Sequence, residues 1–176
     1  MNERHGSAVM EDYLFDSLHG ALTFAYRYSG QQYSPSLMAQ MMRGPMKSGK
    51  GLSGLDGAGQ AGIIRGLVAR LDIYEQKMIA ARFSAVEREY IEARLYLVPV
   101  VIACMPTGMH SRRATDLLVQ KWFGLRLNIQ GVAEEAGKHR NTISPQWRVV
   151  KDTLNGLWDR AEGAAFRELQ DAGIIP

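Results

Sequence analysis

The chain has 176 residues, of which 46% are hydrophobic and 22% are charged, and its net charge is +3. This balance is typical of one globular domain or of two small ones, and it excludes a disordered chain. An isoelectric point near 9.1 permits binding to nucleic acid but does not by itself argue for it.

The first residues of the chain are polar, and no apolar core followed by a cleavage site stands among them. We therefore expect residues 1–10 to form a flexible tail rather than a signal peptide. Residues 11–28 have the helical period, with apolar side chains along one side. A second helix is expected to run to residue 42, with Ser34 as its N-cap and Pro35 in the first helical position.

Residues 44–62 are rich in glycine, and we expect them to form the most mobile loop of the chain. A glycine, four further residues and then Gly49-Lys50 imitate a phosphate-binding loop. Gly51 stands where that loop needs a magnesium-binding serine or threonine, and no apolar strand precedes it, so we reject a nucleotide site. The cations Lys47 and Lys50 are candidates for contacts with a nucleic-acid backbone.

Three further helical patterns cover residues 56–71, 72–83 and 85–98. The apolar positions of the third pattern recur at helical spacing: Tyr90, Ile91, Leu95 and Val98. Its charged residues mix both signs, as on a solvated helix face: Glu87, Arg88, Glu89, Glu92 and Arg94. No run alternates at period two for long enough to indicate a strand, so the expected fold class is all-α.

The chain has one cysteine, Cys104, which excludes an intramolecular disulfide and a zinc site built from several cysteines. It lies in the apolar run of residues 96–105, so we expect a buried, inert thiol rather than a nucleophile. This run is too short to cross a bilayer, and a reducing cytoplasm is the expected compartment. The four histidines share no spacing typical of metal ligands: His5, His19, His110 and His139.

Residues 111–123 are expected to form a helix that braces the segment after it, with Ser111 as N-cap. Its packing side chains are Leu117, Leu118, Trp122 and Phe123. Arg112, Arg113 and Lys121 are expected to face outward, and the two arginines are further candidates for contacts with a nucleic-acid backbone.

Residues 129–150 carry the pattern on which the functional prediction depends. A short helix ends at Gly137, which can take a positive φ angle, and its apolar residues stand three and four apart: Val132, Ala133 and Ala136. We expect a turn over residues 138–143, and then a second helix with Ser144 as N-cap and Pro145 in the first position. That arrangement is a helix-turn-helix.

The second helix is expected to continue to about residue 170, which makes it a long terminal helix. Its apolar stripe consists of Trp147, Val150, Leu154, Leu157, Trp158, Ala161, Ala165 and Leu169. A helix of this length exceeds what insertion into a DNA groove needs. The second half of its stripe must therefore be buried against the preceding helices or against a second copy of the chain.

The stretch resembles the helix-turn-helix of the lactose-repressor family, whose Val-Ala-x-x-Ala-Gly-x-x-x-x-Thr-Val-Ser pattern reads here as Val132-Ala133, Ala136-Gly137 and Thr142-Ile143-Ser144. The resemblance implies a protein that binds double-stranded DNA. The candidate contacts are the polar side chains of the turn and the second helix: Lys138, His139, Arg140, Asn141, Thr142, Gln146, Arg148 and Lys151. The alternative is a plain helical hairpin, in which the small residues serve packing alone.

The side-chain types of these candidates indicate which of them contact bases and which contact phosphates. Arg140, Asn141 and Arg148 are expected to reach base edges, because arginine recognises guanine and asparagine recognises adenine. The lysines of the set, Lys138 and Lys151, are expected to hold phosphates. No acidic residue stands between Glu135 and Asp152, whereas an inert surface would mix both signs.

Residues 67–83, followed later by a helix-turn-helix, are similar in order to region 4 of bacterial sigma factors. The layout of the whole chain looks most like late-gene antitermination and regulatory proteins of phages and prophages. This resemblance implies a transcription regulator in a bacterial or phage-infected cell, with RNA polymerase as a candidate partner and a homodimer as a candidate assembly. The small subunit of a phage terminase, which packages DNA, is the alternative.

An enzyme is not expected, because the sequence offers no Ser/His/Asp set, no cysteine with a histidine close in sequence and no metal motif. We expect no cofactor and no metal. The predicted organisation is a flexible tail at 1–10, a helical scaffold at 11–110 and a helix-turn-helix region at 111–176. The fold is a multi-helix bundle of about seven helices.

Overall fold

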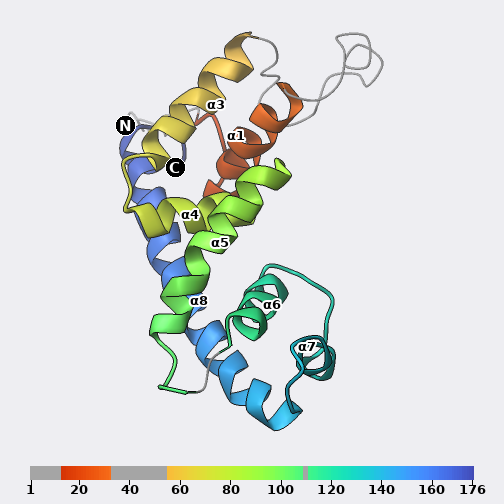
Figure 1. The fold of residues 1–176 in the computed structure, drawn as a ribbon. Coiled ribbons are helices and arrows are strands. Elements are labelled where there is room, and N and C mark those ends of the chain that lie inside the picture. The colour runs from red at the N-terminus through yellow and green to blue at the C-terminus, as the bar shows by residue number, and fades with distance from the viewer. Residues whose placement is uncertain (1–12, 33–54, 109–110) are drawn as a thin grey trace, which may run out of the picture.

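The computed structural model describes residues 13–32, 55–108 and 111–176. In these ranges the chain is all-helical and has no strand, which confirms the predicted fold class (Figure 1). The helices, with their bounds, are α1 (Leu18–Gln32), α3 (Leu55–Val68), α4 (Ile73–Phe83), α5 (Glu87–Ala103), α6 (Arg112–Trp122), α7 (Ile129–Glu135) and α8 (Arg140–Asp171).

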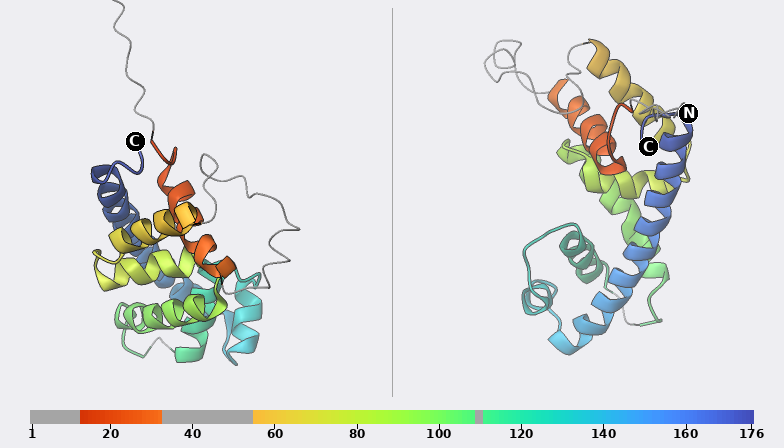
Figure 2. Two further views of the ribbon diagram at one scale, coloured as in Figure 1. Left: turned by 90° about the horizontal axis from the view of Figure 1, so that it is seen from above. Right: turned by 180° about the vertical axis from the view of Figure 1, so that it is seen from behind.

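Helix α8 is the longest element, and every other described helix lies along it. It has 32 residues, which at 1.5 Å per residue is a length of about 48 Å. Its second half packs against α4, α3 and α1, and its first half packs against α6 and α7 (Figures 1 and 2). The buried stripe is Ile143, Gln146, Val150, Leu154, Leu157, Ala161, Ala165 and Leu169. The second half of the predicted stripe is thus buried against the chain's own scaffold.

Helix α1 begins later than the sequence pattern predicted. Its first residue is Leu18 rather than residue 11, and the segment before it is irregular from residue 13 onward. The buried Phe15 explains the shift, because its backbone N–H donates to the Ile174 carbonyl at 3.1 Å. This bond ties the segment to the C-terminal residues, where Ile174 and Ile175 are also buried.

The predicted glycine-rich loop is shorter than expected, because its last part, residues 55–62, belongs to helix α3. Close packing against α1 explains one of its glycines. A Cβ atom added at Gly57 would lie 2.8 Å from the Tyr28 ring, so only glycine allows this approach. Residues 1–12 and 33–54 lie outside the described residues. The predicted tail, the second predicted helix, and Lys47 and Lys50 therefore lie outside them too.

Helix α5 runs five residues further than the predicted end at residue 98, through Pro99 to Ala103. Its buried side is also not the predicted one. The core contacts are made by Ala93, Arg94, Leu97, Val98 and Val101, whereas Ile91 and Leu95 are exposed. Cys104, expected to be buried, is the exposed C-cap residue of α5, because only one side of the last turns faces the core.

A partly buried ion pair joins the scaffold to α6. Arg94 was expected on a solvated face, but its guanidinium is buried and donates to the Asp116 carboxylate. Gln120 donates to the second oxygen of Asp116 at 2.9 Å, and Tyr90 lies beside the guanidinium. Loss of the Asp116 carboxylate would leave the buried Arg94 charge without its partner, so this junction favours one position of α6.

Aromatic side chains make a second junction between the scaffold, α6 and α8. The Arg82 guanidinium lies 4.2 Å from the centre of the Trp158 ring and 5.7 Å from that of Trp122. Trp122 also donates through its indole N–H to Asn155 on α8 at 2.9 Å. Helix α6 therefore braces α8, as the sequence predicted for this segment, and its N-cap is Ser111 as expected.

Residues of α1, α3, α4 and α5 line a small, open polar hollow of about 160 Å³. Two of the charged groups in it pair with each other: the Arg65 guanidinium donates to Glu89 at 3.0 Å, and it lies 4.3 Å from the centre of the Tyr26 ring. Burial raises the pKa of the Tyr26 hydroxyl from 10.0 to about 12, while Arg65 opposes this rise and Glu89 adds to it. The folded state thus favours the neutral phenol.

This raised pKa predicts a loss of stability at alkaline pH. Between pH 10 and pH 12 the unfolded chain releases the Tyr26 proton while the folded chain keeps it, so stability falls by roughly 2–3 kcal/mol as pH rises. Urea unfolding of the wild type and of Tyr26→Phe at several pH values measures this. The variant should lose less stability over that window, and an equal loss in both proteins would contradict the assignment.

Candidate nucleic-acid interface

Helix α7 is short, and both of its ends are defined by its own residues. At its start, the side-chain oxygen of Asn128 accepts a hydrogen bond from the Gly131 N–H at 2.7 Å. Val132 and Ala133 are buried, and α7 packs against α6 and α8. A helix of seven residues is unstable by itself in water, so this packing holds it in place.

The turn after α7 depends on Gly137, whose φ angle is 62°. The Gly137 N–H donates to the Glu134 carbonyl at 3.1 Å, and the Lys138 N–H donates to the Ala133 carbonyl at 2.8 Å. These two bonds form a Schellman motif, which satisfies the last carbonyls of a helix through a residue in the left-handed conformation. The predicted end of the first helix at Gly137 is therefore confirmed.

Helix α8 begins at Arg140, four residues before the predicted N-cap Ser144. The cap is His139, whose imidazole Nδ1 accepts from the Asn141 N–H at 3.2 Å. The predicted turn over residues 138–143 is wrong for this reason. Ser144 lies inside the helix and donates to the Arg140 carbonyl at 3.1 Å. Pro145 is also inside α8, at an exposed position where water can reach the carbonyl left without an amide partner.

The first turns of α8 present a polar side to solvent. At 100° per residue, Arg140, Ser144, Arg148 and Lys151 fall within an arc of about 80°. Ile143 and Val150, which are buried, lie about 100–120° around the helix from the middle of this arc. We call the following exposed residues the basic face: Lys138, His139, Arg140, Asn141, Ser144, Arg148 and Lys151. Among the described residues, no acidic side chain pairs with them, so their charges are available to a ligand.

Two of the predicted contact residues do not belong to this face. Gln146 is buried with 2% of its surface exposed, so it cannot read a base, because it lies on the side of α8 that faces the core. Thr142 is exposed but lies well away from Ser144 around the helix. Conversely, Ser144 belongs to the basic face although it was predicted to be the N-cap of the second helix. Its exposed position within α8 depends on the earlier start of that helix, at Arg140.

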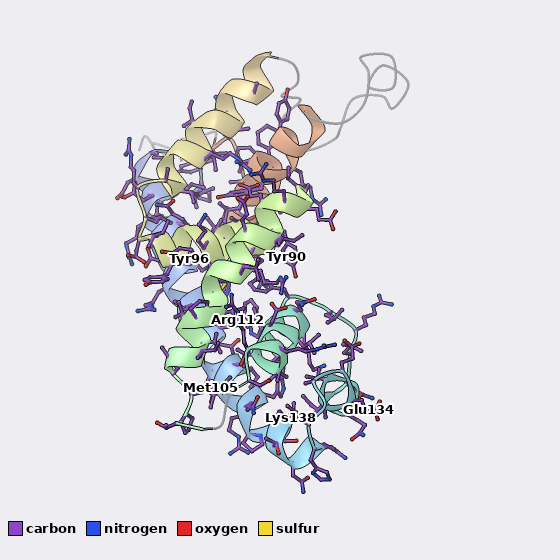
Figure 3. All side chains as sticks on the ribbon, viewed as in Figure 1. Tyr90, Tyr96, Met105, Arg112, Glu134 and Lys138 are labelled. Atoms are coloured by element: carbon purple, nitrogen blue, oxygen red, sulfur yellow. The ribbon has the colours of Figure 1, made fainter. Side chains whose placement is uncertain are left out.

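Of the three cationic residues of α6, two are exposed as predicted and one is not. Arg112 and Arg113 are exposed in the first turn of α6, as predicted, and Figure 3 shows Arg112 in the same part of the molecule as Lys138. Lys121, expected to face outward, is half-buried because its ammonium group donates to the Leu127 carbonyl. It also lies 5.6 Å from the centre of the Trp147 ring, which links the loop before α7 to α8.

The basic face stands at one end of the molecule. Figures 1 and 2 show α6, α7 and the first turns of α8 at this end, and α1 and α3 at the other. Acidic residues appear only at the borders of the face, with Glu134 and Glu135 exposed on α7 and Asp152 on α8. The arrangement can thus attract an anionic surface that meets the start of α8.

No three histidine, cysteine, aspartate or glutamate side chains in residues 13–32, 55–108 and 111–176 gather closely enough to hold a metal ion. None of the described helices combines the length and the apolar character needed to cross a membrane. Comparison with models of known protein families and with curated proteins gives no match to this chain.

The turn geometry predicts opposite effects for the same substitution at two glycines. Gly137→Ala should destabilise the chain by about 1–2 kcal/mol, because alanine is strained at positive φ although space for a Cβ exists. Gly156→Ala, at an exposed position within α8 with open space around it, should stabilise the chain by about 1 kcal/mol. Denaturant unfolding of both variants checks this. Equal signs would contradict the described turn.

Proposed function

We propose that the chain is a sequence-specific transcription regulator that binds double-stranded DNA through the basic face. One observation carries the proposal: no acidic residue stands between Glu135 and Asp152. This segment contains the turn after α7 and the first turns of α8, which lie at one end of the molecule (Figure 1). The basic face combines residue types that bind base edges with residue types that bind phosphates. A helical hairpin kept only for packing would not need this surface composition.

The dimensions of α8 fit this proposal. A helix with its side chains is about 10–12 Å wide, and the major groove of B-DNA is about 12 Å wide. The first three turns of α8 present Arg140, Asn141 and Arg148 toward solvent, and arginine and asparagine are the usual partners of guanine and adenine. We propose that these three side chains read bases, while Lys138 and Lys151 hold phosphates.

Phosphate binding at this end has a second contribution. The backbone N–H groups at the start of α8 carry the positive end of the helix dipole, beside Lys138 and Arg140. If Lys138 and Lys151 each neutralise one phosphate, log K should fall with log salt at a slope of about −2. Arg112 and Arg113 are proposed as additional backbone contacts.

The kind of regulator that we propose is based on the resemblance of the sequence to phage regulatory proteins and to sigma factors. We propose a protein of phage or prophage origin, antiterminator-like or sigma-like, that acts in the bacterial cytoplasm. The scaffold of α1, α3, α4 and α5 is then a candidate surface for RNA polymerase. Selection of bound fragments from the source genome tests the class. Sites at promoters support regulation, whereas sites beside packaging genes, together with a ring of eight or more copies, would identify a packaging protein instead.

The roles of the two kinds of contact are separable by substitution. Arg148→Ala should weaken binding to the preferred site by roughly 1–3 kcal/mol and change binding to other DNA little. Lys151→Ala should weaken binding to all sites alike and reduce the salt slope by about 1. Fluorescence anisotropy with the selected site and with random DNA, at several salt concentrations, measures both.

A matched control is Arg167→Ala, which removes the same charge from an exposed position near the other end of α8. It should leave both affinities unchanged. If Arg148→Ala and Lys151→Ala bind both DNAs as well as the wild type does, the basic face is not the DNA-binding surface.

A further inference from the structure

The polar side of α8 that carries the basic face continues beyond Lys151. Steps of three and four residues keep side chains on one side of a helix. Such steps join one row, in which all side chains except the half-buried Trp158 are exposed: Arg140, Ser144, Arg148, Lys151, Asn155 and Trp158. Trp158 follows Arg140 by 18 residues, which is about five full turns. The row thus leads from the basic face to the part of α8 against which α4 packs (Figure 1).

A cation contacts two tryptophan rings at the end of this row. The Arg82 guanidinium, from the last turn of α4, lies 4.2 Å from the centre of the Trp158 ring and 5.7 Å from that of Trp122. Phe83 supports the first ring, with the two ring centres 6.1 Å apart. The second ring donates through its indole N–H to Asn155 at 2.9 Å. The guanidinium therefore has a defined position before a ligand binds, so that less entropy is lost on binding.

Arg82 has no acidic partner among the described residues. Its side chain is exposed, and no carboxylate of these residues lies within ion-pair distance of it. The negative end of the α4 dipole and the two rings account for the position of this cation. They leave its N–H donors without an acceptor in the described part of the chain. The planar set of donors of an arginine matches the oxygens of a phosphate.

Acidic residues do not interrupt the row between the basic face and Arg82. The acids in this part of α8, Asp152 and Asp159, each directly follow a member of the row, so they lie about 100° around the helix from it. The first acid in the row itself is Glu162, about one turn after Trp158. The positive side of α8 therefore extends as far as Arg82 and ends one turn later.

The distance from the basic face fits a single DNA duplex. Trp158 follows Lys151 by seven residues, or about 10 Å along the axis of α8. One strand of B-DNA carries a phosphate about every 3.4 Å of its axis, so about 10 Å corresponds to roughly three base pairs of a duplex that lies along α8. Under the proposed function, Arg148 reads a base and Lys151 holds a phosphate. A cation still further along this side meets the backbone rather than a base edge.

We propose that Arg82 is a further phosphate contact of this chain with double-stranded DNA. The interface then extends from the helix-turn-helix region onto the scaffold. This inference rests on the proposed function, because Arg82 meets DNA only if the basic face does.

Salt-dependent binding of the full chain tests this contact. Arg82→Gln removes the charge but keeps a long side chain over the rings. It should weaken binding to the selected site and to random DNA alike, by roughly fivefold at about 0.15 M salt, because one phosphate contact releases about 0.9 counterion. The salt slope should fall by about 1. Arg82→Lys, which keeps the charge, should keep the slope. Fluorescence anisotropy at several salt concentrations measures all three proteins.

The matched control is Arg160→Gln, which removes an exposed charge two residues after Trp158 and almost on the opposite side of α8. It should leave the affinity and the slope unchanged. A purely structural role of Arg82 would change the free energy of unfolding but not the slope. If Lys151→Ala lowers the slope and Arg82→Gln does not, the inference is wrong and the proposed function stands. An equal loss in Arg160→Gln would also overturn it. A wild type that binds neither DNA would overturn both.

Neutral phosphates locate the contact. A methylphosphonate replaces one charged phosphate of the selected site by a neutral group, and each position is tested in turn. At one position, roughly three base pairs from the phosphate held by Lys151, the replacement should weaken binding of the wild type but not of Arg82→Gln. The phosphate of Lys151 is identified by the same comparison with Lys151→Ala. Equal costs for the wild type and Arg82→Gln at every position would contradict the inference.

Discussion

Every described part of the molecule depends on the continuous apolar stripe of α8. Its second half is buried by α1, α3 and α4, and its first half is buried by α6 and α7. The intrinsic helix propensities of its 32 residues contribute little to the stability of α8, because burial of one side provides most of the stability of helices in proteins. The stripe therefore contributes to one core that contains residues of the scaffold helices and of α6 and α7. The basic face has a defined position because α8 cannot turn without exposing this stripe.

The junctions beside α8 limit its remaining freedom. The partly buried pair of Arg94 and Asp116 holds α6 against α5, and the hydrogen bond from Trp122 to Asn155 holds α6 against α8. Lys121 then connects the loop before α7 to the first half of α8. These contacts surround the short helix α7 with fixed neighbours, so that its seven residues can present a turn of defined shape.

Features encoded by neighbouring residues could be predicted from the sequence, whereas features set by distant contacts could not. The Ser111 cap, the helix end at Gly137 and the α8 stripe depend on residues a few positions apart. In α5, however, Tyr90, Ile91, Leu95 and Val98 are all apolar, and only the positions of α4 and α6 decide which of them are buried. Arg94 is buried because its partner, Asp116, stands 22 residues away. In the candidate site, the start of α8 was misplaced because a histidine rather than a serine caps it.

The length of α8 has a mechanical consequence. If α8, about 48 Å long, tilts about its middle together with the helices packed on it, each of its arms is about 24 Å long. A tilt of about 10° then moves its tip by about 4 Å, which is close to the 3.4 Å rise between neighbouring base pairs. A shift of α3 or α4 that tilts α8 in this way would thus displace Arg140 at the other end of the molecule, and under the proposed function this displacement corresponds to about one base-pair step. The stiffness of α8 thus couples the scaffold to the far tip, in addition to the contacts of α5 with α6.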